Sequence, residues 1–211
     1  MKTLLVIDMQ NDFAKPNGSL YVPEGEKVIE PIVELMKDPQ WHRVVVTRDW
    51  HPPNHVSFAR THGKPDFSEI EYQCPKPGDD SHQTGVLWPV HCVQNSTGAQ
   101  LAPEILETVQ EKHIKIVDKG YLPDREYYSA FNDIWDWHHT ELDEYLKKHH
   151  TTEVYVVGLA LDYCVMNTAI SAANLGYDTT ILKSYTKAIY TDDEHKKQLH
   201  EKLEKNNVKL Q

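Results

Sequence analysis

The chain has 211 residues, of which 39% are hydrophobic and 26% are charged, and its formal net charge is −10. That length suits one domain with a substantial core, while the acidic balance argues against a protein that binds the phosphates of nucleic acids. No apolar run approaches the roughly 18 residues of a membrane helix, so we expect no membrane association either.

The elements predicted along the chain alternate between strands and helices. Five short runs rich in Val and Ile are continuously apolar, which is typical of strands buried on both faces of a parallel sheet. Most of the intervening stretches have apolar residues three and four apart, the spacing of amphipathic helices. In chain order, the expected elements are strand 3–7, helix 26–36, strand 43–47, helix 103–111, strand 114–117, helix 141–148, strand 154–157, helix 163–175, strand 179–182 and helix 192–205. This alternation predicts an α/β fold, a three-layer α/β/α domain with a mostly parallel, doubly wound sheet.

Two segments interrupt the alternation. Residues 47–101 contain no clear element and are rich in Pro, His, Asp and Gly, and residues 120–139 are rich in aromatic side chains. A structureless connection that long in a compact domain is usually functional. Both segments leave from the C-terminal end of a predicted strand, the edge at which open α/β sheets bind ligands.

Four polar or reactive side chains lie at the ends of four predicted strands. Asp8 closes the first, Asp49 lies just past the second, Lys119 follows the third, and Cys164 opens the helix after the fourth. One such residue alone would more often be a helix cap, but four that converge on one sheet edge favour a ligand site.

Cys164 is the candidate nucleophile. A helix N-terminus and a nearby lysine both lower the pKa of a thiol, and Asp8 could take the thiol proton. The amides of residues 158–164 are natural donors to an oxyanion. The alternative is that Cys164 is a packing residue of a small-residue helix. We interpret Cys92 as structural because it directly follows a candidate metal ligand.

Asp49, His51 and His91 are the candidate metal ligands. Asp49 and His51 are two residues apart and point to the same side of an extended chain. Two imidazoles and a carboxylate suit Zn²⁺, with Fe²⁺ or Mn²⁺ as alternatives. Spacing alone does not separate this interpretation from a turn cap with two packed histidines. Of the thirteen histidines, these are the two we expect as ligands; His55 shows no ligand-like pairing with them.

Other site types are excluded or weaker. The chain contains no phosphate-binding loop, no dinucleotide-binding G-x-G-x-x-G after the first strand, no G-x-S-x-G elbow and no paired C-x-x-C zinc motif. Four aromatic residues flank the reactive ones in sequence, and a flat aromatic substrate would stack against such neighbours, although each alone would fit a core. They are Phe13, Trp88, Tyr128 and Tyr163.

Six short strings together resemble one family. They are VIDMQNDF (6–13), TRDWHP (47–52), WPVHC (88–92), DKG (118–120), DREYYSAF (124–131) and GLALDYCV (158–165). In this order they closely resemble the nicotinamidases of the isochorismatase-like cysteine hydrolases, and the resemblance is closest to the fungal, yeast-type enzymes. It covers almost the whole chain, so we expect one domain over 1–211 with a long metal-site insertion at about 48–100.

The resemblance implies hydrolysis of nicotinamide to nicotinate and ammonia through a cysteine thioester, as in NAD salvage, with pyrazinamide as an alternative substrate. It implies a catalytic triad of Asp8, Lys119 and Cys164, with Asp49, His51 and His91 holding one divalent metal ion. It further implies an oxyanion hole from the amides of Ala160 and Cys164, a cis peptide at Leu159–Ala160, and a pocket walled by the four aromatic residues above. A fourth protein ligand is not identified, and we expect Ser57 to act only through water.

Several alternatives remain. A related amidase acting on another aromatic or carbamoyl amide is disfavoured because the carbamoyl relatives generally lack the D-x-H plus His91 set. Isochorismatase proper needs no cysteine nucleophile. A catalytically idle binding protein would have lost a triad or ligand position. A hydrolase that uses metal-bound water, with Cys164 inert, is separable by thiol alkylation.

Compartment and assembly follow less directly from the sequence. Three cysteines are too few for a disulfide framework, which favours an intracellular, reducing compartment. We expect the cytoplasm, with the nucleus or peroxisome as alternatives, although the C-terminus VKLQ is not a peroxisomal S-K-L signal. The resemblance leaves self-association into a homo-oligomer open.

Overall fold

A computed structural model describes all residues 1–211 and contains a six-stranded sheet in which every neighbouring pair is parallel. The strand order is β5-β2-β1-β6-β7-β8. The chain first builds outward from β1 to β2 and β5, then returns to build the other half from β6, so the order reverses between β1 and β6. The strands are β1 Lys2–Ile7, β2 Arg43–Asp49, β5 Lys115–Lys119, β6 Glu153–Leu159, β7 Asp178–Lys187 and β8 Lys209–Leu210.

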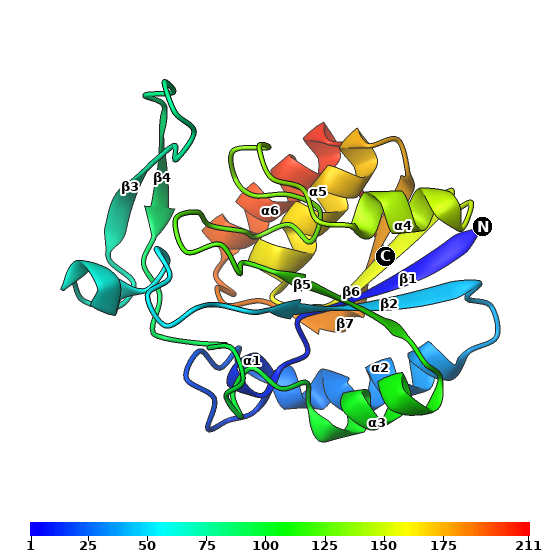
Figure 1. The fold of residues 1–211 in the computed structure, drawn as a ribbon. Helices are drawn as coiled ribbons and strands as arrows, with labels where there is room; N and C mark the ends of the chain where they lie inside the picture. Colours follow the sequence, from blue (N-terminus) through cyan, green and yellow to red (C-terminus); the bar gives the residue numbers. More distant parts are fainter.

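Helices cover both faces of the sheet, which confirms the predicted three-layer α/β/α fold. α2 (Ile29–Lys37) and α3 (Pro103–Glu111) lie on one face, and α4 (Leu142–Lys148), α5 (Met166–Asn174) and α6 (Asp193–Lys205) lie on the other (Figure 1). Alternate residues of β1 serve the two layers, because successive strand side chains point to opposite faces. Leu4 and Val6 belong to the apolar cluster on the α2/α3 side, while Leu5 and Ile7 belong to the cluster on the α4/α5/α6 side. No helix is both long and apolar enough to cross a bilayer.

The segment 47–101 contains a hairpin that the sequence analysis missed. β3 (Glu69–Gln73) and β4 (His82–Val86) pair antiparallel and project from the main body (Figure 1). Both strands are short and largely exposed, so neither has the apolar run or clean alternation by which a buried strand is recognised. A small apolar cluster of Ala59, Tyr72 and Leu87 holds the hairpin base.

Two predicted helices begin with a turn that is not α-helical. The expected helix 26–36 is a 3-10 turn, Gly25–Val28, that continues into α2. The expected helix 163–175 starts as a π-helical turn, Leu161–Val165, before α5. The Ala160 carbonyl accepts hydrogen bonds from the amides of both Tyr163 and Val165, each at 3.1 Å. A π-helical turn is frequently found at a functional site.

Candidate active site

The four strand-end residues meet at the carboxyl edge of the sheet. Asp8 directly follows β1 with a φ of 48°, Asp49 ends β2, and Lys119 ends β5. Cys164 lies in the π-helical turn after β6. All four side chains are buried, and the site sits where the strand order reverses, the usual ligand position in this architecture.

The ammonium of Lys119 lies at the centre of this group. Its Nζ is 3.0 Å from Asp8 Oδ2 and 3.5 Å from Cys164 Sγ, and it also donates a hydrogen bond to Asp49 Oδ1. Burial alone would lower its pKa, but the two carboxylates hold the pKa of Lys119 well above its ordinary value. Asp8, Asp49 and Cys164 lie close enough together to hold a metal ion, yet the ammonium already supplies the positive charge there.

The Cys164 thiol is protonated in this environment. Burial raises the pKa of Cys164 well above its ordinary value, although the charge of Lys119 opposes the shift. We expected the lysine and the helix N-terminus to lower this pKa; burial outweighs them because it removes water from around the thiolate. Burial also raises the pKa of Asp8, whose Oδ1 accepts a 2.6 Å hydrogen bond from Thr47 Oγ1. An oxygen of the Asp8 carboxylate lies within 4.8 Å of Cys164 Sγ, so the thiol can pass its proton to Asp8 without a pre-formed thiolate.

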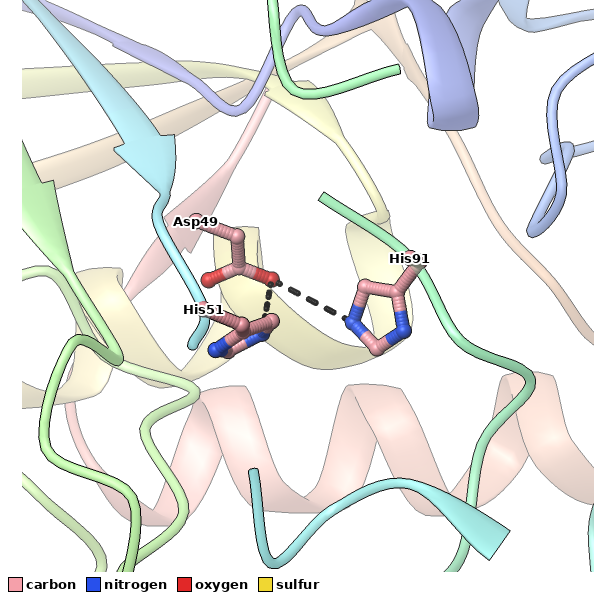
Figure 2. A group of neighbouring side chains, drawn as sticks. All are labelled: Asp49, His51 and His91. Carbon is pink, nitrogen blue, oxygen red and sulfur yellow. Dashed lines mark ion pairs between the residues drawn. The ribbon is translucent and has the colours of Figure 1, made fainter. Parts of the chain in front are cut away.

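Asp49 also forms a second group with His51 and His91, which we call the ligand group (Figure 2). Asp49 Oδ2 is 3.4 Å from His51 Nε2 and 3.7 Å from His91 Nε2. Each imidazole donates from Nδ1 to a backbone carbonyl at 2.7 Å, His51 to Gly120 and His91 to Pro89, which leaves each Nε2 as the ring nitrogen that can bind a metal ion. Bonds of about 2.0–2.1 Å at a tetrahedral angle place ligand atoms about 3.4 Å apart, so the three residues fit a zinc-type ion.

Gly120 is required by this arrangement. Its φ is 71°, and a Cβ built there would lie 2.5 Å from Cε1 of the His51 ring. A larger residue would displace the imidazole whose Nδ1 bonds to the same glycine's carbonyl.

His55 lies against the ligand group without belonging to it, and we expected no ligand-like pairing of His55 with these residues. Its ring stacks on His51 with 4.0 Å between centroids. Burial holds the pKa of His55 well below its ordinary value, so the ring is neutral. His55 Nε2 then donates to the Arg125 carbonyl at 3.0 Å, and Nδ1 accepts from Ser57 Oγ at 2.7 Å. Ser57 is thus bonded to His55 rather than aimed at the ligand group.

One pocket brings the two groups together. Cys164, Asp49 and His91 line it with all four predicted aromatic residues, Phe13, Trp88, Tyr128 and Tyr163. The rings of Trp88 and Tyr163 are perpendicular with centroids 4.9 Å apart, and Tyr128 lies 5.5 Å from Tyr163. The same pocket includes Ala160, and the Leu159–Ala160 peptide is cis, as the resemblance implied. The arrangement provides an apolar, flat-walled space that reaches both the thiol and the ligand group.

Five further residues line this pocket and were missed. They are Leu20, Val22, Glu126, Tyr127 and Ile189. Glu126 is almost fully buried, and burial raises its pKa to about 7. An acid directly before the two tyrosines of the DREYYSAF string was the available signal for Glu126, whereas Leu20, Val22 and Ile189 carry no local signal.

A wider hollow than this pocket lies elsewhere in the molecule. A groove of about 620 Å³ runs between the β3–β4 hairpin, α5 and α6. It shares Tyr128 and Tyr163 with the pocket but contains none of the triad or ligand-group residues. Size alone therefore does not locate the chemistry in this fold.

Known proteins of the same architecture resemble the chain over its whole length. Residues 2–208 match the isochorismatase domain family. The chain is 58% identical to the nicotinamidase of Saccharomyces cerevisiae over 100% of this chain and 99% of that protein. The crystal structure of the yeast nicotinamidase bound to the inhibitor nicotinaldehyde has the same coverage and a TM-score of 0.97. The zinc complex of a Pyrococcus horikoshii pyrazinamidase is 32% identical, with a TM-score of 0.73, over 100% of this chain and 98% of that one.

Proposed function

The chain belongs to the isochorismatase family, and we propose that it is a nicotinamidase, an amidohydrolase that converts nicotinamide to nicotinate and ammonia. One observation carries the proposal. The buried Asp8–Lys119–Cys164 cluster reaches an aromatic-walled pocket through Cys164, and the ligand group reaches the same pocket through Asp49 and His91. Such a pocket suits a planar ring whose carboxamide lies at the thiol. Nicotinate formation in this way would serve NAD salvage.

The proposed reaction begins with proton transfer from Cys164 to Asp8. The thiolate attacks the carboxamide carbon, and the amides of Ala160 and Cys164 bind the oxyanion that develops on the carbonyl oxygen. The C–N bond then breaks, and ammonia leaves with the proton that Asp8 had taken. Water, deprotonated by Asp8, hydrolyses the thioester and regenerates the thiol as nicotinate departs.

Lys119 acts as a fixed charge in this scheme. Its raised pKa keeps it protonated, so it is unsuited to serve as a base. At 3.5 Å from Sγ it stabilises the thiolate when that forms, and its bonds to the two carboxylates hold Asp8 beside the nucleophile.

We propose that Asp49, His51 and His91 hold one divalent metal ion. The nitrogen and carboxylate donors and their spacing favour Zn²⁺, with Fe²⁺ or Mn²⁺ as alternatives. A bound ion would act as a Lewis acid that orients and polarises the substrate ring, and it would not generate the nucleophile. The zinc-bound pyrazinamidase relative supports this choice.

Further properties are proposed on the same basis. Pyrazinamide has the same planar ring and carboxamide, so we propose it as a second substrate. The whole chain would act as one domain, and its three free thiols favour an intracellular setting.

Ammonia release by the purified chain tests the proposal. Nicotinamide, pyrazinamide and N-carbamoyl compounds are compared, each with and without a chelator. We expect release from the two aromatic amides, reduced by the chelator. Release from carbamoyl compounds alone would contradict the substrate assignment.

A further inference from the structure

The string Gln10-Asn11-Asp12 carries three polar side chains that the proposed chemistry does not use. It follows Asp8 and enters the short helix α1 (Asn11–Ala14). Gln10 is completely buried. Burying a carboxamide is costly unless its donors and acceptor are all satisfied, so its partners indicate why it is there.

Gln10 holds the backbone of the ligand-group residue Asp49. Its Oε1 accepts from the Asp49 amide at 2.8 Å, and its Nε2 donates to the Asp49 carbonyl at 2.7 Å. Nε2 also donates a second hydrogen bond, to the Ala99 carbonyl at 2.8 Å. Because β1 ends at Ile7, the side chain of Gln10 takes the place of a neighbouring strand for the last residue of β2.

Asp12 holds the segment that carries His91. Its Oδ2 accepts a 2.8 Å hydrogen bond from the amide of Cys92, the residue that follows His91. Cys92 has a φ of 48°, a left-handed conformation that a non-glycine residue adopts at a cost. The backbone of Asp12 also donates to the Gly98 carbonyl at 3.0 Å, so the ligand-bearing loop is fixed to α1 from both sides.

These contacts position two of the three residues of the ligand group, Asp49 and His91. Asp49 and His91 come from segments far apart in the chain. The distance of 3.7 Å between Asp49 Oδ2 and His91 Nε2 therefore depends on where each backbone segment is held. We infer that Gln10 and Asp12 are positioning residues that set the metal affinity of the Asp49–His51–His91 group. The inference rests on the proposed function, since it assumes that this group binds an ion.

Metal titration of the purified chain separates positioning from simple structural support. The variants are Gln10→Met, which removes all three hydrogen bonds at similar length, and Asp12→Asn, which weakens the hold on the other segment. Asn11→Ala is the matched control. Asn11 lies in the same string and donates to the Thr97 carbonyl at 2.9 Å, but this bond is solvent-exposed and its side chain has no hydrogen bond to the ligand group.

The metal-free proteins are titrated with Zn²⁺ and Co²⁺ against a chromophoric chelator, and the visible Co²⁺ spectrum is recorded. We expect Gln10→Met and Asp12→Asn each to weaken binding by about 10–100-fold, the usual effect of removing an outer partner of a metal site. Their Co²⁺ absorption should change shape, while Asn11→Ala should match the wild type. Melting temperatures of the metal-free proteins are measured in parallel.

Two results would overturn the inference. Variants that melt lower but bind both ions as the wild type does would show structural support alone. A wild type that binds neither ion would remove the proposed metal site together with this inference. If Gln10→Met does not fold, Asp12→Asn tests the same idea on the segment that carries His91.

Discussion

Replacing Lys119 with methionine should damage both catalysis and folding, through the same missing charge. In the wild type the ammonium lies 3.5 Å from the sulfur that becomes a thiolate. At an effective dielectric constant of about 20, two unit charges at that distance interact by about 5 kcal/mol. Since each 1.36 kcal/mol is a factor of ten in rate, losing most of this term predicts a fall in kcat/KM of roughly 10³-fold.

The stability of this variant should depend on pH. Removing one partner of a buried charge group costs about 3–5 kcal/mol, because Asp8 and Asp49 are left as uncompensated carboxylates. Without the lysine, the pKa of Asp8 rises further above its ordinary value, and Asp49 loses the largest charge that lowers its pKa, so protonation of the carboxyls relieves the folded state. The stability deficit should therefore be small in acid and should grow as the pH rises toward neutrality.

Urea unfolding of the metal-free wild type and Lys119→Met, at several pH values between 5 and 8, measures this deficit. Ammonia release at neutral pH measures the kinetic effect. A deficit that does not change with pH, or activity within about tenfold of the wild type, would refute the assignment of Lys119 as the charge that stabilises the cluster.

Four further substitutions test other parts of the site. Cys164→Ala should abolish ammonia release while Zn²⁺ content stays at the wild-type level, and Cys92→Ala should retain turnover; the reverse pattern would exchange their roles. Gly120→Ala should displace the His51 ring, costing about 1–3 kcal/mol in urea unfolding and lowering Zn²⁺ content, because the new Cβ would lie 2.5 Å from Cε1; normal metal content would contradict the steric argument. Glu126 has its pKa raised to about 7 by burial, so its contribution to stability is present in acid and is lost as the pH rises through about 7. Glu126→Gln, measured metal-free, should flatten that loss, and an unchanged pH profile would show that Glu126 does not titrate there.

The main sheet could be predicted from sequence because its strands are buried on both faces. The run 43–47 has three consecutive valines, residues 44–46, without alternating polar residues, which distinguishes it from half-exposed strands. The hairpin β3–β4 could not be found this way, since its residues are mostly exposed and its stability depends on a few distant apolar contacts. The C-terminal end of β7 was also missed. The expected strand ends at residue 182, but β7 continues to Lys187 because its last residues pair with β6, and this pairing is not visible in the sequence.

The candidate site was predictable where chemistry and strand position coincide. Asp8 and Lys119 lie at strand ends, and they could be predicted because open α/β sheets bind ligands at the carboxyl ends of their strands. Gln10 acts through contacts with Asp49 and Ala99, and Ile189 reaches the pocket from a distant loop; these contacts exist only after folding. The direction of the Cys164 pKa also required the structure, since only burial shows that desolvation outweighs the nearby charge.

Interception of the acyl-enzyme by hydroxylamine tests the central claim most directly. A thioester on Cys164 would be attacked by hydroxylamine in competition with water, so nicotinamide turnover in its presence should yield both nicotinohydroxamate and nicotinate. The hydroxamate fraction should rise with hydroxylamine concentration, and Cys164→Ala should give neither product. Turnover to nicotinate alone at every hydroxylamine concentration, with activity retained in Cys164→Ala, would contradict the account and indicate direct attack by water.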